Sequence, residues 1–454
     1  MRLEEAPRMT VRQMSQGDRV ASSMWLASRL GLLALAGTVA CGGGAGARGG
    51  TGEDDGSSAS GDASGSTGDV GTSSSTSGDG DGDGDGGAGA SGSGSSSSST
   101  SGDGDGDGDG DGDGGSAGVD CSGLPADGPD RDTVVDQIDG VTVETFAGSA
   151  NAGTDDGDLS EATFSNPVNL VIDGDGLSVA DFDSGRIRRI DGDGNVTTIV
   201  AQDDFTRPFG LTLVDGLLVV QTDEEEAEGA PVGGAIWNVD LADGGAELVV
   251  EQVGRLRGLA TLTGGEVVVA DVRSMTVSLF NGADGSMAPL AGGDDCPAFQ
   301  DGVGNQARFN GPLGMVVLDG DMLVADRDNH SIRRITPSGE VSTFAGDGVP
   351  GMVDGNLAEA RFFFPKDLAV DAAGNVYVSD VGNHRIRRIR TNGVVETIAG
   401  DGQAGYADGA GAEARFFGAE GIDVTPDGST IYVADGTDGE VGQPYHRIRK
   451  ISLP

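Results

Sequence analysis

The stretch "GNHRIRRI" at residues 382–389 has near-copies elsewhere in the chain, and it decides the fold. The copies are "SGRIRRI" (184–190), "NHSIRRI" (329–335) and "YHRIRKI" (445–451). The stretch follows "VYVSD" (376–380), whose β-branched and aromatic residues favour a strand, whereas Gly, Asn and Asp favour turns. We therefore predict a hairpin turn at 381–384 between a strand that ends at Asp380 and one that begins at Arg385. His384 is then a turn residue.

Comparison of the chain with itself extends this hairpin to a unit of four short strands. One strand of the unit occurs six times, at 143–148, 196–201, 246–251, 287–292, 341–346 and 395–400. Each copy is followed by an apolar strand, by a strand that ends in a polar residue, and by a closing strand. Four short strands that recur roughly every 40–55 residues are typical of a β-propeller.

Three features of the unit carry a resemblance to a known family: a proline, a strand that ends in Val-x-Asp, and the run Asn-His-x-Ile-Arg-Arg. Together they resemble the NHL repeat family of six-bladed β-propellers. The resemblance covers 141–454 and is most specific in the units that end near residues 191, 336 and 390. The two units between 196 and 282 lack Asn-His and the Arg pairs, so they rest on the strand pattern alone. The resemblance implies an all-β, six-bladed propeller.

The phase of the repeats predicts how the ring closes. The chain begins with an outer strand that has no unit of its own, and it ends with a unit that lacks this strand. We expect residues 142–147 to complete the sixth blade beside 448–451. A sheet closed in this way has no free edge.

The N-terminal 41 residues have the pattern of an export signal. A basic residue, Arg29, precedes the short apolar run 31–40, which ends in small residues before Cys41. Ten apolar residues are too few to span a bilayer and suit a cleaved signal peptide. The ending resembles the lipobox of bacterial lipoproteins, which implies lipidation of Cys41 and a membrane contact through that lipid only. We predict a signal peptide at 1–40, with Met24 as an alternative start, and an exported, cell-envelope protein.

Residues 41–118 read as a disordered linker after the lipidated cysteine, and 119–140 lead into the propeller. The linker is made of Gly, Ser, Thr, Ala and Asp, and such a tract buries too little apolar surface to fold. Its alternating Asp-Gly runs lack the Glu and apolar flanks of an EF-hand, so weak calcium binding is the only cofactor role that we leave open.

The net charge of −46 opposes nucleic acid as a partner. Residues 120–454 hold −34 of this charge, so the folded part is itself strongly acidic. Some NHL relatives read RNA with a basic face, but this charge argues against the same role here. We expect a monomer that binds a protein, peptide or glycan.

Four of the six connections between units are long and share one register, with Phe eight residues after Asp. The pairs are Asp156 and Phe164, Asp301 and Phe309, Asp354 and Phe362, and Asp408 and Phe416. One interpretation is an Asp-Gly turn that leads into a helical turn, with Phe as the core anchor. The other is a set of binding loops, because loops on a rigid scaffold often carry recognition.

We expect the long connections and the hairpins to share one face of the ring. This candidate binding face is marked by Asp156, Asp301, Asp354, Asp408, His330, His384 and His446. The histidines, the only three in the chain, occupy equivalent corners of different blades. A zinc ion needs its ligands within bonding distance, so we predict no metal site there.

We interpret the arginine pairs of the repeat as structural residues of the blades. In "RIRRI" the two Ile lie three apart and therefore face opposite sides of the strand, as a blade between two neighbours requires. We expect the accompanying arginines to lie at blade rims, in water, with exposed Asp partners. They are Arg188, Arg189, Arg333, Arg334, Arg387 and Arg388.

The starts of the inner strands should line the mouth of the central channel. The residues predicted there are Asn169, Arg257, Lys366, Asp367 and Glu420. Lactonase-like propellers hold a metal at this position with acidic and amide groups. Here the cationic side chains of Arg257 and Lys366 lie among such groups, which disfavours a metal ion. The chain also lacks a nucleophile elbow and a phosphate loop, so we assign no catalytic residue. A binding module is our first hypothesis, a metal-dependent hydrolase or lyase the second, and a structural envelope protein the third.

Two cysteines remain once Cys41 is assigned to lipid. Cys121 and Cys296 both lie in polar segments, so neither resembles a buried core thiol. An even remainder in an oxidising compartment suggests a disulfide between them. Roughly twenty extended residues between Cys121 and the first strand provide the reach across one face of the ring.

Overall fold

The structure is a computed structural model that describes residues 138–454 except 225–232, 294–295 and 441. The predicted signal peptide, the lipidation site Cys41, the linker, most of the segment 119–140 and Cys121 lie outside these residues. No helix in the described part of the chain is long and apolar enough to cross a membrane.

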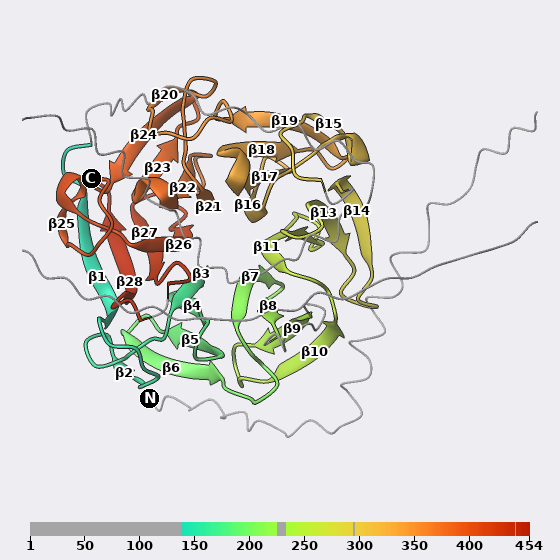
Figure 1. Cartoon of the computed structure of the whole chain (residues 1–454). Coiled ribbons are helices and arrows are strands. Elements are labelled where there is room, and N and C mark those ends of the chain that lie inside the picture. Colours follow the sequence, from blue (N-terminus) through green and yellow to red (C-terminus); the bar gives the residue numbers. More distant parts are fainter. Residues whose placement is uncertain (1–137, 225–232, 294–295, 441) are drawn as a thin grey trace, which may run out of the picture. The chain divides into compact units, whose positions relative to one another are not determined.

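Six antiparallel sheets stand around a central axis as the blades of a propeller, which confirms the predicted all-β, six-bladed fold (Figure 1). In chain order, the innermost to outermost strands of blades 1 to 3 are β3 (Pro167–Asp173), β4 (Gly176–Asp181), β5 (Arg186–Ile190) and β6 (Asn195–Val200); β7 (Pro208–Val214), β8 (Leu217–Asp223), β9 (Gly234–Asp240) and β10 (Ala246–Glu251); β11 (Leu256–Thr261), β12 (Val267–Asp271), β13 (Thr276–Phe280) and β14 (Met287–Gly292).

Blades 4 to 6 repeat the arrangement. Their strands are β16 (Pro312–Leu318), β17 (Asp321–Asp326), β18 (Ser331–Ile335) and β19 (Glu340–Ala345); β21 (Pro365–Val370), β22 (Val376–Asp380), β23 (Arg385–Ile389) and β24 (Val394–Ala399); β26 (Gly418–Val424), β27 (Thr430–Gly436), β28 (His446–Ser452) and β1 (Thr142–Ser149). The predicted hairpin of blade 5 is confirmed, because the short 3-10 turn η4 (Val381–Asn383) and His384 separate β22 from β23.

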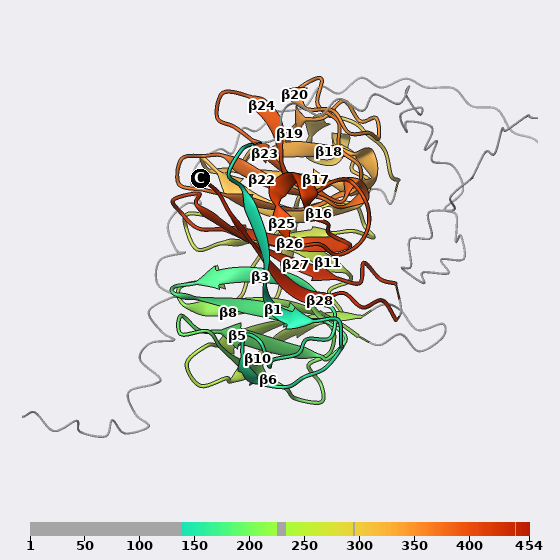
Figure 2. The same ribbon diagram turned by 90° about the vertical axis from the view of Figure 1, so that its left-hand side faces the viewer.

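The ring closes as predicted, with the first strand of the chain in the last blade. β1 lies on the outer side of β28, and Val143 pairs with Ile451 in antiparallel register (Figure 2). The pairing runs from Thr142 opposite Ser452 to Ser149 opposite His446, two residues beyond the predicted end of the strand. Backbone hydrogen bonds therefore hold the first and last strands of the ring together.

Apolar side chains fill the space between neighbouring blades. Ile187 packs in a cluster with residues of blade 2 such as Trp237, whereas Ile190 packs in a cluster with residues of blade 6 such as Ile448. The two isoleucines thus face opposite sides of one strand, as their spacing predicts. A blade has both faces buried, so β-branched residues on either side of its strands are removed from water.

The four long connections add a short fifth strand to the outer edge of a blade. These strands are β2 (Gly157–Asp158), β15 (Gly302–Val303), β20 (Gly355–Asn356) and β25 (Gly409–Ala410). Each phenylalanine that follows is fully buried, which confirms its predicted role as a core anchor; they are Phe164, Phe309, Phe362 and Phe416. The connection leaves one blade at the hairpin side, descends along the rim of the next blade, and returns to begin its inner strand.

Candidate functional site

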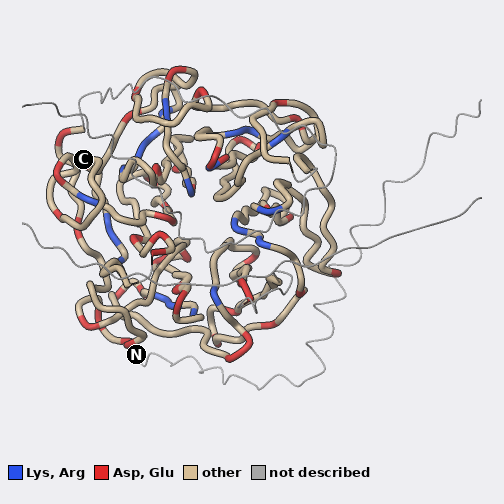
Figure 3. The backbone as a smooth tube through the Cα atoms, in the orientation of Figure 1, with Lys and Arg blue, Asp and Glu red and all other residues tan. Residues whose placement is uncertain are grey.

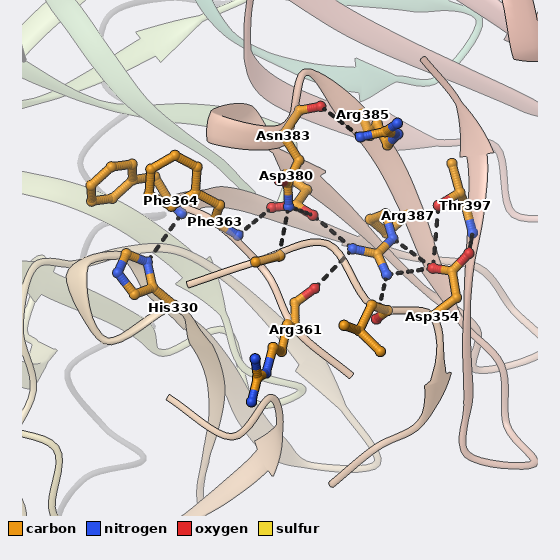
Figure 4. A network of polar contacts seen from close by, with 12 residues as sticks. His330, Asp354, Arg361, Phe363, Phe364, Asp380, Asn383, Arg385, Arg387 and Thr397 are labelled. Atoms are coloured by element: carbon orange, nitrogen blue, oxygen red, sulfur yellow. Dashed lines mark hydrogen bonds and ion pairs between the residues drawn. The ribbon is translucent and has the colours of Figure 1, made fainter. Parts of the chain in front are cut away.

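The aspartate of each long connection takes part in a buried ion-pair network, which we call the arginine clamp. In blade 5, Arg387 donates from Nη1 to Asp380 Oδ2 at 2.8 Å and from Nε to Asp354 Oδ1 at 3.0 Å (Figure 4). Its remaining guanidinium hydrogens go to the Arg361 carbonyl at 3.0 Å, the Val353 carbonyl at 2.9 Å and again to Asp354. All five donors of Arg387 are satisfied, and the three charged side chains are 0% exposed.

Three other blades repeat the clamp. Its arginine, strand-end aspartate and connection aspartate are Arg188, Asp181 and Asp156 in blade 1, Arg333, Asp326 and Asp301 in blade 4, and Arg449, Asp435 and Asp408 in blade 6. Each guanidinium also lies 5.1–5.4 Å from the ring centroid of its anchoring phenylalanine. The connection aspartate accepts from a threonine of the outermost strand as well; in blade 5 this is the backbone N–H of Thr397 at 3.0 Å.

These contacts correct two predictions. Arg188, Arg333 and Arg387 are fully buried and do not lie in water at blade rims. The neighbouring arginines Arg189, Arg334 and Arg388 have side chains that are 26%, 45% and 14% exposed. Their acidic partners are Asp173, Asp321 and Glu396, whose side chains are only 4%, 15% and 15% exposed. The connection aspartates lie on the outer rim beside the outermost strands and are engaged by arginine, so they do not form one binding face with the histidines.

Blades 2 and 3 lack the clamp arginine, although blade 3 keeps an aspartate, Asp271, at the end of its second strand. In blade 2, Trp237 stands at the arginine position and donates from Nε1 to Thr222 Oγ1 at 2.9 Å. In blade 3 the arginine position holds Ser278, which pairs with Val269. Both blades still form four-stranded sheets, so the strand pattern was sufficient to predict them.

The histidines lie on the hairpin face and connect one blade to the next. His330 Nδ1 accepts from the Phe364 N–H at 3.3 Å, and His446 Nδ1 accepts from the Asn166 N–H at 3.0 Å. His384 Nδ1 lies 3.2 Å from the Phe417 carbonyl. Burial, and then the charge of Arg447, lower the pKa of His446, which favours the neutral ring that this contact requires. We call these contacts the histidine bridges.

The five residues predicted at the channel mouth are brought together. Asn169, Arg257, Lys366, Asp367 and Glu420 line one small space together with Val168, Phe209, Leu313 and Gly314. This space measures about 10 Å³, roughly room for one water molecule, so the mouth is a constriction. We refer to these nine residues as the mouth.

Four of the six inner strands have a glycine two residues after the last residue that pairs before the register shift, and these glycines make the constriction possible; they are Gly210, Gly258, Gly314 and Gly421. A Cβ on Gly258 would lie 2.0 Å from the Leu313 carbonyl oxygen, and one on Gly314 would lie 2.1 Å from Asp367 Oδ1. Only blades 5 and 1 have a side chain at this position, Asp367 and Asn169. These two side chains depart from the glycine found at this position in the other blades. Functional sites often show such local departures from a repeat pattern.

The cations of the mouth are held in place by carboxylates. Lys366 Nζ donates to Asp438 and lies 3.6 Å from Glu420 Oε2, and Arg257 Nη2 lies 2.7 Å from Asp223 Oδ2. Arg257 also stacks 3.9 Å above the centre of the Phe209 ring. Burial opposes the charge of Lys366, but the carboxylates around it raise its pKa overall. Acidic positions are found on the outer loops of the ring as well as inside it (Figure 3).

A larger cavity of about 330 Å³ continues from the mouth along the inner strands. Its lining is mainly aliphatic, with the carboxyl groups of Asp367 and Asp423 among the polar exceptions. Asp367 Oδ2 accepts from the Ile422 N–H at 3.1 Å and Asp423 Oδ2 from the Ile172 N–H at 2.7 Å, so each carboxyl bonds the inner edge of the next blade. Burial raises the pKa of Asp367 to about 7 and that of Asp423 to about 6.

Two features bear on the remaining predicted sites. Within the described residues, no three His, Cys, Asp or Glu side chains lie close enough together to hold a metal ion. Cys296 is 4% exposed and is disulfide-bonded, so it is more buried than its polar surroundings suggest. Its predicted partner Cys121 lies outside the described residues, and their pairing stays a prediction.

Sequence reasoning missed the groups that hold the mouth in place. Asp223 and Asp438 do not lie at the start of an inner strand. Phe209 does, but its apolar side chain gave no signal of a polar site. Asp423 was missed because it lies near the far end of its inner strand. Repeat comparison identifies positions within one blade, whereas these contacts join different blades.

Comparison with known proteins agrees with this architecture. The NHL repeat profile matches residues 362–389, which supports the resemblance to that family. A 130-residue stretch is 35% identical to NHL repeat-containing protein 2 of Gallus gallus, covering 26% of this chain and 18% of that protein. A 138-residue stretch is 33% identical to Protein SUPPRESSOR OF QUENCHING 1, chloroplastic, of Arabidopsis thaliana, covering 28% of this chain and 13% of that protein. The matches thus span under a fifth of these curated relatives.

Solved structures share the fold at lower sequence identity. An auxiliary nutrient binding protein from Bacteroides thetaiotaomicron superposes with a TM-score of 0.55 at 20% identity, over 69% of this chain and 76% of that chain. A protein of the same description from Bacteroides ovatus gives a TM-score of 0.54 at 18% identity, over the same shares. These structures support the propeller fold.

Proposed function

We propose that this protein is an exported binding module, anchored to the cell envelope by lipid on Cys41, that holds a protein, peptide or glycan ligand at the hairpin face of its propeller. The observation that carries the proposal is the mouth. It gathers amide, carboxylate, ammonium and guanidinium groups at one point, and its cations are held by carboxylate partners. Polar groups fixed in this way are suited to orienting a ligand without a large entropic cost.

The shape of the site favours a polar ligand that lies across the face and places one end at the mouth. The mouth admits about one water molecule, whereas the cavity below it has the size of a small-molecule site. The opposite charges of Lys366 and Glu420 stand beside one another, so a ligand group of either sign finds a partner there. Two proteins with this fold are described as auxiliary nutrient binding proteins, which is in keeping with a binding role.

Capture experiments with the lipidated full-length protein test this function. We expect envelope extracts and glycan or peptide arrays to yield a ligand that the wild type retains and that a variant with Arg257→Ala and Lys366→Ala loses. Arg390→Ala is the matched control, because Arg390 is a half-exposed cation beside Glu396 at the opposite end of a blade. Equal retention by all three proteins would contradict a ligand site at the mouth.

One observation favours an enzyme as the second candidate. Asp367 lies at the mouth with a pKa of about 7, the range in which a carboxyl group serves as a general base at neutral pH. Its hydrogen bond from the Ile422 N–H gives it a structural role that needs no chemistry. Hydrolase or lyase turnover that Asp367→Asn abolishes, together with a stoichiometric metal in the purified protein, would favour the enzyme over the binding module.

A further inference from the structure

A second surface pocket, of about 380 Å³, opens on the hairpin face between blades 1 and 2. One wall is the hairpin 182–186 between β4 and β5, and the other is the connection 201–207 between β6 and β7. Phe205, which is 1% exposed, is part of its lining. The pocket adjoins the mouth, because the ring centroids of Phe182 and Phe209 are 6.1 Å apart.

The pocket exists because two structural features of other repeats are missing at this junction. The turn position that holds His330 and His384 in other blades is occupied by Gly185, so no histidine bridge spans the gap. In addition, the connection 201–207 is short and lacks the long Asp-Gly segment found at four other junctions. At three other junctions a histidine ring and a long connection occupy this space, whereas here it is open to solvent.

Both walls of the pocket are fixed by hydrogen bonds. The Phe182 and Asp183 N–H groups donate to the carbonyls of Asn166 and Ser165, each at 3.0 Å. On the other wall, Thr206 Oγ1 donates to the Asp223 carbonyl at 2.7 Å. A pocket with rigid walls binds a ligand without the cost of ordering a loop.

The lining combines two aromatic rings, those of Phe182 and Phe205, with polar groups whose charges cancel. The carboxylates of Asp183 and Asp203 are exposed, and the guanidinium groups of Arg186 and Arg207 are partly exposed, which gives a formal charge of zero in a domain of −34. The Gln202 amide adds a donor and an acceptor. Carboxylate, amide and guanidinium groups pair well with hydroxyl groups, and an aromatic side chain such as Phe182 offers apolar surface to the C–H face of a pyranose ring.

We propose that the pocket between blades 1 and 2 is a carbohydrate-binding site for a neutral mono- or disaccharide unit. The inference rests on the proposed binding function and names its ligand class. A volume of about 380 Å³ lies at the lower end of the range for small-molecule sites, about 300–1,000 Å³. The lining has no net charge that would favour a ligand of one sign, whereas a ligand rich in hydroxyl groups finds donors and acceptors on both walls.

The test fills the pocket without removing a contact. Gly185 has φ of +63°, and His330 and His384 adopt φ of +50° at the equivalent position, so Gly185→His is compatible with the backbone. An added Cβ would lie 3.1 Å from the Phe205 carbonyl oxygen, which requires a shift of a few tenths of an ångström. Gly185→Ala is the matched control, because it adds the same Cβ and leaves the pocket open. Asp203→Ala removes one exposed carboxylate and keeps the proposal testable if Gly185→His folds poorly.

Saturation-transfer NMR on the full chain, with millimolar glucose, galactose, xylose, maltose and cellobiose, reads out binding. Glucuronic acid and glucosamine serve as charged comparators. We expect at least one neutral sugar to bind, Gly185→His to weaken it at least about 10-fold, and Asp203→Ala to weaken it about 2- to 10-fold, the loss of one hydrogen bond. Gly185→Ala should bind within about 2-fold of wild type.

The outcomes separate this inference from the proposed function. Failure of every neutral sugar to bind, or binding that Gly185→His leaves unchanged, overturns the carbohydrate site. If a ligand is captured that is lost with Arg257→Ala and Lys366→Ala but is retained by Gly185→His, the binding module stands and the pocket does not. Loss with Gly185→His and retention by the mouth variant support the pocket.

Discussion

Replacement of Arg387 by methionine should destabilise the protein far more than any other single loss of positive charge in blade 5. Methionine keeps most of the side-chain volume and removes the guanidinium group. The substitution leaves the carboxylates of Asp354 and Asp380 without their cation, and both are 0% exposed. It also leaves the carbonyls of Val353 and Arg361 without a donor from this side chain. Removing one partner of a buried ion pair typically costs about 3–5 kcal/mol, and we expect a loss of unfolding free energy in that range.

Two matched variants test the physical reason for that magnitude. In blade 4, Arg333→Met removes the same kind of guanidinium, but its partner Asp301 is 51% exposed and can be hydrated when the arginine is lost. The loss should therefore be smaller than for Arg387→Met by at least about 1 kcal/mol. Arg390→Met removes a cation whose side chain is 46% exposed, and such surface pairs contribute about 0–1 kcal/mol.

Equilibrium denaturation in urea, followed by circular dichroism, measures the three losses under one condition. The expected order of destabilisation is Arg387→Met, then Arg333→Met, then Arg390→Met. A loss below about 1 kcal/mol for Arg387→Met, or equal losses for Arg387→Met and Arg333→Met, would refute the argument that desolvated carboxylates determine the cost.

Three further predictions concern the channel carboxyls and the cysteines. Because the folded-state pKa values of Asp367 and Asp423 lie above the value of about 4 for a free aspartate, the folded state binds more protons between pH 4 and pH 7, and stability falls as pH rises through this window. The gain in melting temperature from Asp367→Asn should thus be larger at pH 8 than at pH 5; an equal or smaller gain at pH 8 would contradict the sign. Mass spectrometry of the mature N-terminus should find lipid on Cys41, and an unmodified N-terminus at another residue would exclude the anchor. Non-reducing peptide mapping should join Cys121 to Cys296, and recovery of Cys296 linked to any other cysteine would rule out that pairing.

The sequence predicts the ring because the information lies in repetition. Six copies of one strand fix the number of blades, and the phase of the first copy places β1 beside β28. The same reasoning failed for Arg188, although the isoleucines on either side of it were placed correctly. A strand covered on both faces offers no exposed face in its middle, so a charged residue there must be buried with a partner. The partner Asp156 lies 32 residues earlier, in a connection whose path along the rim the strand pattern does not specify.

The candidate site was likewise predictable only in part. Asn169 and Asp367 were predicted at the mouth because inner-strand starts converge in any propeller, and the structure brings them together. The pocket between blades 1 and 2 depends on what is missing, a ring at Gly185 and a long connection before β7. A missing side chain is visible in the sequence, but the volume that it leaves depends on how two neighbouring blades pack.

The closure of the ring by β1 also determines on which face of the propeller the described part of the chain begins. β28 begins at His446, on the hairpin face, and ends at Ser452, and Thr142 pairs with that far end. The chain therefore joins the propeller on the side opposite the mouth, next to its own C-terminus, where Gly140 approaches Pro454. Residues 138–142 therefore enter the ring at the face opposite the mouth and the neighbouring pocket. A fluorescent label or fusion placed after Pro454 would lie on this same face and leave the mouth and the pocket unobstructed.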